Sequence, residues 1–227
     1  MSTRKTRFTV LSLILFSISS FTQAQTIGIK GGFTDAWQDY GAVQLPPDAE
    51  THIKGFHFSL EYYRQLNRFL SYGVEPGLVR RGAASVPGWN GGVVPIFNGD
   101  TKFLLDYVEL PIALQGQIPL FKTGFSIFGK LGYGASFIAK AQQEKITFRM
   151  PQDDVTTTPI TLGKGSILNR WDHGGYAGIG LSYQFSGHQI FCEYDFYNGF
   201  RDAERFNTSK NRDMDFSLGY RFTLNSL

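Results

Sequence analysis

Internal disulfides and membrane-spanning helices are both excluded by what this chain lacks. Its 227 residues contain one cysteine, Cys192, which has no partner for an internal disulfide. The one long apolar run is residues 8–21, and nothing after it approaches the roughly 18 to 20 apolar residues that a spanning helix needs. If the rest of the chain crosses a membrane, it must do so as a closed β-barrel in which every strand edge is paired.

An excess of charge is also missing once the N-terminus is set aside. Residues 1–24 have the pattern of a secretory signal peptide, with three basic residues, then the apolar run, then Ala24 before the expected cleavage site. Cleavage there would remove three basic residues and no acidic ones, so the remaining Lys and Arg would equal the 19 Asp and Glu. Residues 25–227 therefore offer no basic surface for nucleic acid, and we predict no nucleic-acid partner.

The chain does have a two-residue alternation. From Asp213 to Leu224, even positions are apolar or aromatic and odd positions are polar or glycine. Because successive side chains of a strand point to opposite faces, such a segment has one apolar and one polar face. The pattern recurs in seven earlier segments, so the predicted strands are 26–35, 54–64, 69–82, 103–117, 123–139, 174–185, 188–198 and 213–224.

The connections between these strands alternate in length. Long ones cover 36–53, 83–102, 140–173 and 199–212, and short ones cover 65–68, 118–122 and 186–187. Outer-membrane barrels have short periplasmic turns and long external loops. The sequence therefore predicts an all-β domain over 25–227, an eight-stranded antiparallel up-and-down transmembrane β-barrel. We expect it in the outer membrane, with four long extracellular loops and both termini in the periplasm.

The predicted outward faces carry no charge. They are aliphatic and aromatic, as in Phe56 to Tyr62 and Val108 to Leu114, and aromatic residues gather towards both strand ends. Two interfacial belts explain this distribution. A soluble ligand-binding barrel is the alternative, but it would need these side chains to be covered.

The predicted inward faces carry charges of both signs beside glycines. Eight strands enclose a space that side chains can fill, so these charges must pair with one another. We predict a charged network that plugs the lumen without an open pore, formed by Lys30, Glu61, Glu75, Arg81, Glu109, Lys130, Glu193, Asp195 and Arg221.

An enzyme is not predicted. Two of the inward carboxylates could act as the acid and base of a glycosidase, but their cationic neighbours favour a structural network. His52, His57, His173 and His188 lack metal-ligand spacing. No serine is predicted beside a histidine on one strand face, so a lipid-hydrolysing triad is not expected. We predict no catalytic residue, metal or cofactor.

Two segments carry a resemblance to a known family. Tyr107-Val108-Glu109-Leu110-Pro111 resembles the signature of the PorT-like outer-membrane β-barrel family common in Bacteroidetes, and Glu75-Pro76-Gly77 to Arg81-Gly82 resembles its second marker. The resemblance implies an outer-membrane barrel and, as for a few members, a part in protein secretion. Since proline cannot donate to a ladder, Pro76 and Pro111 predict bulges or unpaired positions.

These patterns together predict a monomeric outer-membrane barrel without enzymatic activity, with a structural or interaction role through its loops. The alternatives are an accessory component of a secretion system and a lipid-modifying outer-membrane enzyme. Expected partners are outer-membrane lipids, the barrel-assembly machinery and envelope or secretion-system proteins. The predicted insertion signal is the C-terminal set Gly219, Tyr220, Phe222 and Leu224.

Overall fold

The computed structural model describes residues 24–39, 52–85, 100–120, 123–147, 154–163, 166–204 and 209–224. Apart from Ala24, the predicted signal peptide lies outside the described residues. Within these ranges there is no helix of the length and apolarity that crossing a membrane requires.

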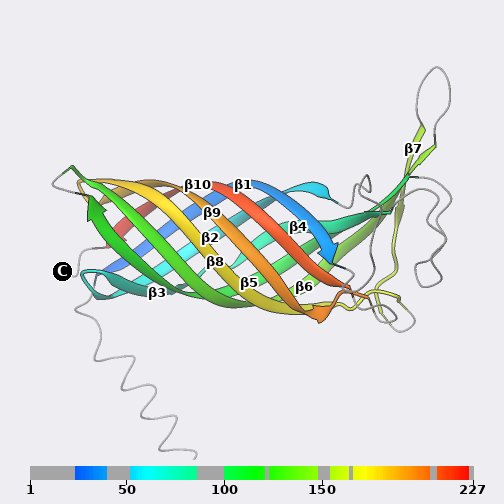
Figure 1. Cartoon of the computed structure of the whole chain (residues 1–227), viewed down its shortest axis with the longest axis horizontal. Helices are drawn as coiled ribbons and strands as arrows, with labels where there is room; N and C mark the ends of the chain where they lie inside the picture. The colour runs from blue at the N-terminus through cyan, green and yellow to red at the C-terminus, as the bar shows by residue number, and fades with distance from the viewer. Residues whose placement is uncertain are drawn as a thin grey trace, which may run out of the picture.

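The described residues form one antiparallel sheet that closes on itself (Figure 1). Its strands are β1 (Gln25–Asp39), β2 (Ile53–Asn67), β3 (Leu70–Val74), β4 (Gly77–Ser85), β5 (Asp100–Leu120), β6 (Phe125–Thr147), β7 (Asp154–Pro159), β8 (Trp171–Phe185), β9 (His188–Asp202) and β10 (Lys210–Leu224). β1 pairs with both β2 and β10, which closes the barrel. β3 and β4 follow one another along the same barrel strand, and β7 pairs with the end of β6 alone. The barrel therefore has eight strands, and the predicted up-and-down all-β fold is confirmed.

The break between β3 and β4 falls at Glu75 and Pro76. Val74 pairs with Ile112 before the break and Gly77 pairs with Glu109 after it, so the register is unchanged. The Glu75 amide still donates to the Pro111 carbonyl at 3.0 Å. The prolines therefore leave unpaired positions, as the sequence allowed, without a bulge.

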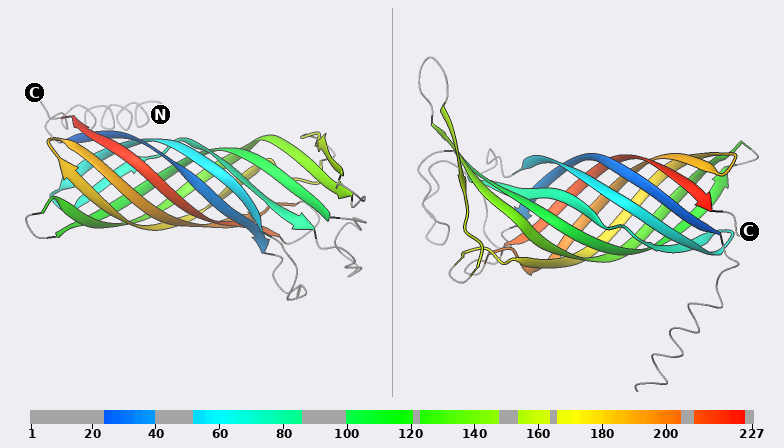
Figure 2. Two further views of the ribbon diagram at one scale, coloured as in Figure 1. Left: turned by 90° about the horizontal axis from the view of Figure 1, so that it is seen from above. Right: turned by 180° about the vertical axis from the view of Figure 1, so that it is seen from behind.

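A bulge does occur elsewhere, at a position that no proline or glycine marks in the sequence. Asp106 pairs with Lys140 but Tyr107 pairs with Ile138, so β6 has one extra residue, Ala139. Beyond the bulge, β6 extends to Thr147, past its predicted end, and forms a hairpin with β7 within the predicted loop 140–173. Figure 2 shows that this hairpin projects from the long-loop end of the barrel.

The shortest connection also has a local cause. Ser186 and Gly187 join β8 to β9, and both have positive φ, 45° and 81°. Two consecutive positive φ angles give the tight turn whose twist matches that of the flanking strands. The predicted two-residue connection at 186–187 is therefore a hairpin turn.

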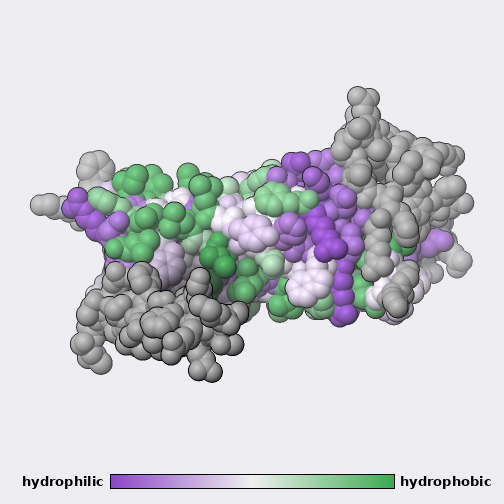
Figure 3. Space-filling model, turned by 90° about the horizontal axis from the view of Figure 1, so that it is seen from below, coloured by the Kyte–Doolittle hydropathy of each residue, from purple (hydrophilic) through white to green (hydrophobic). Residues whose placement is uncertain are grey.

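The alternation of the sequence appears as alternation of burial. Leu131 is 68% exposed and its neighbour Lys130 is 5% exposed; Leu218 is 63% exposed beside fully buried Ser217. Figure 3 shows apolar side chains over much of the barrel wall, with a hydrophilic band towards the end that carries β7. Most of the large exposed side chains are apolar, and a network of charged side chains is buried inside, which is the reverse of a soluble protein. The interior also holds a smaller apolar cluster, formed by Val79, Leu105, Tyr107, Ile138, Ala141 and Leu168.

Aromatic side chains contact one another near both ends of the barrel. At the short-turn end, the ring of Tyr183 lies near those of Phe125 and Phe185, and His188 lies between Phe185 and Phe222. At the long-loop end, Phe137 packs on Trp171 with 4.7 Å between ring centroids. This placement is typical of side chains at the two interfaces of a membrane.

Deletion of residues 219–227 should prevent membrane assembly. Residues 219–224 pair with Gln25–Lys30 of β1, and 219–222 pair with β9, so the deletion leaves both neighbouring edges open in the membrane. The measurement is heat-modifiable migration on SDS gels of membrane fractions. Deletion of 225–227 alone, beyond the paired residues, is the control. Normal insertion of the longer deletion would refute the role of this segment.

Candidate functional site in the barrel interior

The most distinctive chemistry of this protein lies inside the barrel. All nine charged residues of the predicted network are buried, none more than 9% exposed. Most lie on inward positions of the strands, and Glu75 lies in the break between β3 and β4. The inward charges form three layers along the barrel axis.

The layer nearest the short turns is a bidentate ion pair. Arg221 donates from Nε to Glu61 Oε2 at 2.7 Å and from Nη2 to Glu61 Oε1 at 2.9 Å. Its guanidinium also lies over the ring of Phe191, 4.0 Å from the centroid. A Cβ at Gly28 would be 2.7 Å from Arg221 Cγ, so glycine at that position makes room for the pair.

The middle layer holds two lysines among three carboxylates. Lys30 Nζ lies 2.7 Å from Glu75 Oε2 and 3.1 Å from Asp195 Oδ2. Lys130 Nζ lies 2.9 Å from each of the same two oxygens and also contacts Glu193. Four strand segments are thus tied across the interior, because these residues come from β1, β6, β9 and the β3–β4 break.

The layer nearest the long loops is built on Arg81. Its Nη2 donates to Glu109 Oε2 at 2.8 Å, and its Nε donates to Asp213. The Tyr176 hydroxyl donates to the same Glu109 oxygen at 2.7 Å. The Arg81 guanidinium also lies over the ring of Tyr197, 4.1 Å from the centroid. Charged hydrogen bonds and aromatic faces together satisfy this buried cation.

Several residues of the network were not predicted from the sequence. Asp213 and Asp215 lie on the polar face of the segment where the alternation is clearest, so the same reasoning could have included them. Tyr63, Tyr107, Tyr176 and Tyr197 are also inward, where the alternation places them, but their residue type did not indicate a role among the charged side chains. Asp172 is buried on β8, just before the predicted strand start at 174.

Carboxylates outnumber cations in this interior. The buried residues of the described ranges include four Lys and Arg side chains and eight carboxylates, namely Glu61, Glu75, Glu109, Asp172, Glu193, Asp195, Asp213 and Asp215. Within the same ranges, no group of three or more His, Cys, Asp or Glu is arranged to hold a metal ion. Carboxyl groups therefore outnumber Lys and Arg two to one among the buried residues of the described ranges.

Contrary to expectation, a serine and a histidine do meet. His57 Nε2 lies 2.7 Å from Ser217 Oγ, and His57 Nδ1 lies 3.5 Å from Asp215 Oδ1. The prediction considered single strand faces, whereas β2 and β10 both pair with β1 and bring these side chains together across it. The three residue types are those of a hydrolase triad.

This cluster has no route for a substrate within the described residues. Ser217 is fully buried, and the cavity beside His57 and Asp215 measures about 20 Å³. Such a cavity holds about one water molecule. The arrangement is therefore a buried hydrogen-bonded cluster, and the cavity beside it is too small for a lipid chain.

The other three histidines lie on the outside of the barrel. His52 contacts Asp35 at 3.0 Å, and His173 and His188 contact the hydroxyls of Tyr133 and Tyr220. Each of these histidines thus has a polar or aromatic neighbour on the barrel wall, and none is near His57.

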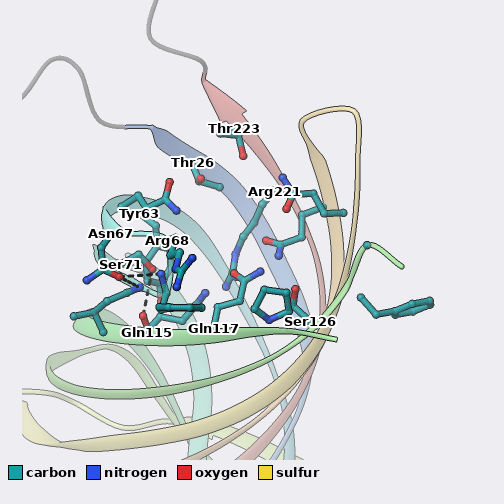
Figure 4. Close-up of a pocket in the computed structure, with 18 residues that line it drawn as sticks. Thr26, Tyr63, Asn67, Arg68, Ser71, Gln115, Gln117, Ser126, Arg221 and Thr223 are labelled. Atoms are coloured by element: carbon teal, nitrogen blue, oxygen red, sulfur yellow. Dashed lines mark hydrogen bonds between the residues drawn. The ribbon is translucent and has the colours of Figure 1, made fainter. Parts of the chain in front are cut away.

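A second cavity opens at the short-turn end (Figure 4). It measures about 380 Å³, and side-chain amides and hydroxyls dominate its wall. Arg221 and Tyr63 line it where it meets the first ion layer. The amides are those of Gln65, Asn67, Gln115, Gln117, Gln184 and Gln189. This vestibule is polar, but of its lining residues only Arg68 and Arg221 are charged.

The predicted insertion-signal residues occupy both faces of β10. Tyr220, Phe222 and Leu224 point outward and are 40%, 37% and 40% exposed. Gly219 lies beneath the ring of Phe191, where a Cβ would come within 2.1 Å of the ring.

Comparison with known proteins gives neighbours among solved structures alone. No family model and no curated protein matches this chain. Neisserial surface protein A is 14% identical, with a TM-score of 0.48, covering 88% of this chain and 99% of its own. Ail of Yersinia pestis, in complex with sucrose octasulfate, is 16% identical with a TM-score of 0.40 and the same coverages. The N-terminal β-barrel domain of Pseudomonas aeruginosa OprF is 9% identical with a TM-score of 0.35, covering 88% of this chain and 97% of that domain. At these values the fold assignment rests on the strand pairing described above.

Replacing Glu109 by Gln should destabilise the barrel by about 1–3 kcal/mol, because the buried Arg81 cation loses one of its negatively charged partners and keeps only a neutral amide there. The measurement is equilibrium unfolding by guanidinium in lipid vesicles. Asp106→Asn is the matched control, since the Arg80–Asp106 pair lies on the barrel wall and should contribute under about 1 kcal/mol. Equal losses in the two variants would contradict the importance of the buried layer.

Proposed function

We propose that this protein is an integral outer-membrane β-barrel without enzymatic activity, which has a structural or interaction role at its long-loop end. The observation that carries the proposal is the inversion of the barrel. Exposed apolar side chains cover the outside of all eight barrel strands between their ends, and paired charged side chains lie inside. A soluble protein would need to cover such an outside, whereas lipid does so directly.

The orientation follows from the ends of the chain. Gln25 at the start of β1 pairs with Leu224 at the end of β10, so these two strand ends lie together at the short-turn end (Figure 1). Barrels of this kind place short turns in the periplasm. We therefore propose periplasmic termini and external long loops, with outer-membrane lipids and the assembly machinery as general partners.

We propose that the lumen of the barrel is plugged and is not an open channel. Three layers of paired side chains cross the interior, and each cation within them has two or more partners. Because the sheet closes, no barrel edge is left for another subunit, which supports a monomer. Contact with other envelope proteins would then involve the long-loop side.

A role in protein secretion is the second candidate. The two segments that resemble the PorT-like family lie side by side, since Gly77 pairs with Glu109 and Arg81 pairs with Leu105. Their charged side chains meet in the Arg81–Glu109 pair. The charged residues of the two resembling segments thus contribute to the network inside the barrel. An unchanged profile of secreted proteins in a deletion strain would exclude this candidate.

In fractionated cells, the protein should be found with the outer membrane. The purified protein should show no stable current in a planar bilayer. The paired side chains leave no continuous water path, so single-channel steps are not expected. Heat-modifiable migration of the same sample confirms that the barrel is folded. A stable conductance from folded protein would contradict the plugged lumen.

Replacing Ser217 by Ala should leave membrane lipids unchanged but cost about 1–3 kcal/mol of stability, because His57 Nε2 loses its buried partner. Lipid mass spectrometry and unfolding of the same variant provide the two readouts. Ser59→Ala is the control, since the buried Ser59 hydroxyl makes no hydrogen bond among the described residues. Loss of a lipid product with a folded barrel would instead support an enzyme.

A further inference from the structure

Outward cations gather at one end of the barrel. At the long-loop ends of the strands, Lys54, Lys140, Arg170, Arg201 and Lys210 are exposed. None of them forms an ion pair within the described ranges. At the short-turn end, the cations on the described part of the wall are Arg64 and Arg68. Carboxylates also lie at the long-loop end, namely Asp35, Asp39, Asp106, Glu144, Asp202 and Glu204, so this rim carries charges of both signs and its cations are separated from one another by acidic residues.

Three of the cations on this rim fall along one side of the barrel. Arg80 on β4 pairs in register with Asp106 on β5, which pairs with Lys140 on β6. The next strand follows directly, because the Ile138 amide donates to the Arg170 carbonyl at 2.9 Å. We refer to Arg80, Lys140 and Arg170 as the cationic strip. Asp106 binds Arg80 at 2.6 Å and 3.0 Å, so Lys140 and Arg170 give the strip its net charge.

Aromatic rings hold part of the strip in place. The Arg170 guanidinium lies 4.2 Å from the centroid of the Phe137 ring, and Phe137 packs on Trp171. Trp171 is nevertheless 57% exposed. A guanidinium fixed on a ring loses less side-chain entropy when it binds an anion, and Trp is the side chain favoured at a headgroup boundary.

The apolar wall begins directly below the strip. Two residues along β5 from Asp106, Val108 is 47% exposed, and Tyr133 on β6 is 51% exposed. Figure 3 shows a hydrophilic band bordering the apolar wall towards this end. A ligand that matches both surfaces has anionic groups at one end and acyl chains at the other.

We propose that the cationic strip binds the phosphate groups of lipid A, the phosphorylated saccharolipid of the outer leaflet, with its acyl chains along the wall below. This inference rests on the proposed outer-membrane location. A soluble anion would use the cations alone, whereas the lipid also uses the adjoining apolar surface. Clusters of Lys and Arg beside a membrane surface bind anionic headgroups in this way.

The test uses the folded protein in nanodiscs of zwitterionic lipid, with binding of bisphosphorylated lipid A measured by native mass spectrometry. Wild type should bind it more tightly than dephosphorylated lipid A and phosphatidylglycerol. Lys140→Gln and Arg170→Gln should each weaken binding of the bisphosphorylated lipid roughly fivefold, the value of one surface cation beside an anionic membrane.

Arg64→Gln with Arg68→Gln is the matched control, because it removes two cations at the opposite rim. This control should leave lipid A binding unchanged. Equal binding of dephosphorylated lipid A, equal binding of phosphatidylglycerol, or equal loss in the control variant would each overturn the proposal. Failure of the protein to enter nanodiscs would instead contradict the proposed membrane location, so the two failures are distinguishable.

Discussion

The whole structure depends on the requirement that backbone N–H and C=O groups find partners where no water can supply them. The chain meets this requirement by closing β1 on β10. Closure with eight barrel strands leaves a narrow interior that side chains must fill, and in the proposed membrane location the apolar residues are needed outside against lipid. The inward positions therefore hold the buried polar and charged residues, beside a smaller apolar cluster around Leu105 and Ile138.

Burying so many charges is costly unless each has partners, and the layers show how this cost is offset. Cations are shared between carboxylates, and guanidinium groups lie on aromatic faces, as Arg221 does on Phe191 and Arg81 on Tyr197. Glycines on the inward face provide the space, as Gly28 does for Arg221. Charged residues and glycines thus alternate around the lumen because long side chains from one strand occupy the space left by another.

The eight strands and the burial of charges such as Lys130 followed from the sequence, because period-two alternation is a local property. The Ala139 bulge and the β6–β7 hairpin did not follow, since both depend on pairing with distant residues. The contact between His57 and Ser217 was missed for the same reason. These residues are 160 positions apart and meet only because β1 lies between their strands. Which inward charges pair, and which tyrosines join them, likewise depends on barrel closure.

The two prolines give one place in the wall an unusual dependence on its side chains. Glu75 N donates to Pro111 O and Leu60 N donates to Pro76 O, but neither proline can return the bond. One residue pair on each side of the β3–β4 break, towards β5 and towards β2, thus has one backbone hydrogen bond in place of two, at the point where Glu75 binds Lys30, Lys130 and Tyr63. The side-chain contacts of Glu75 therefore connect this segment to other strands at a place where two backbone hydrogen bonds are missing.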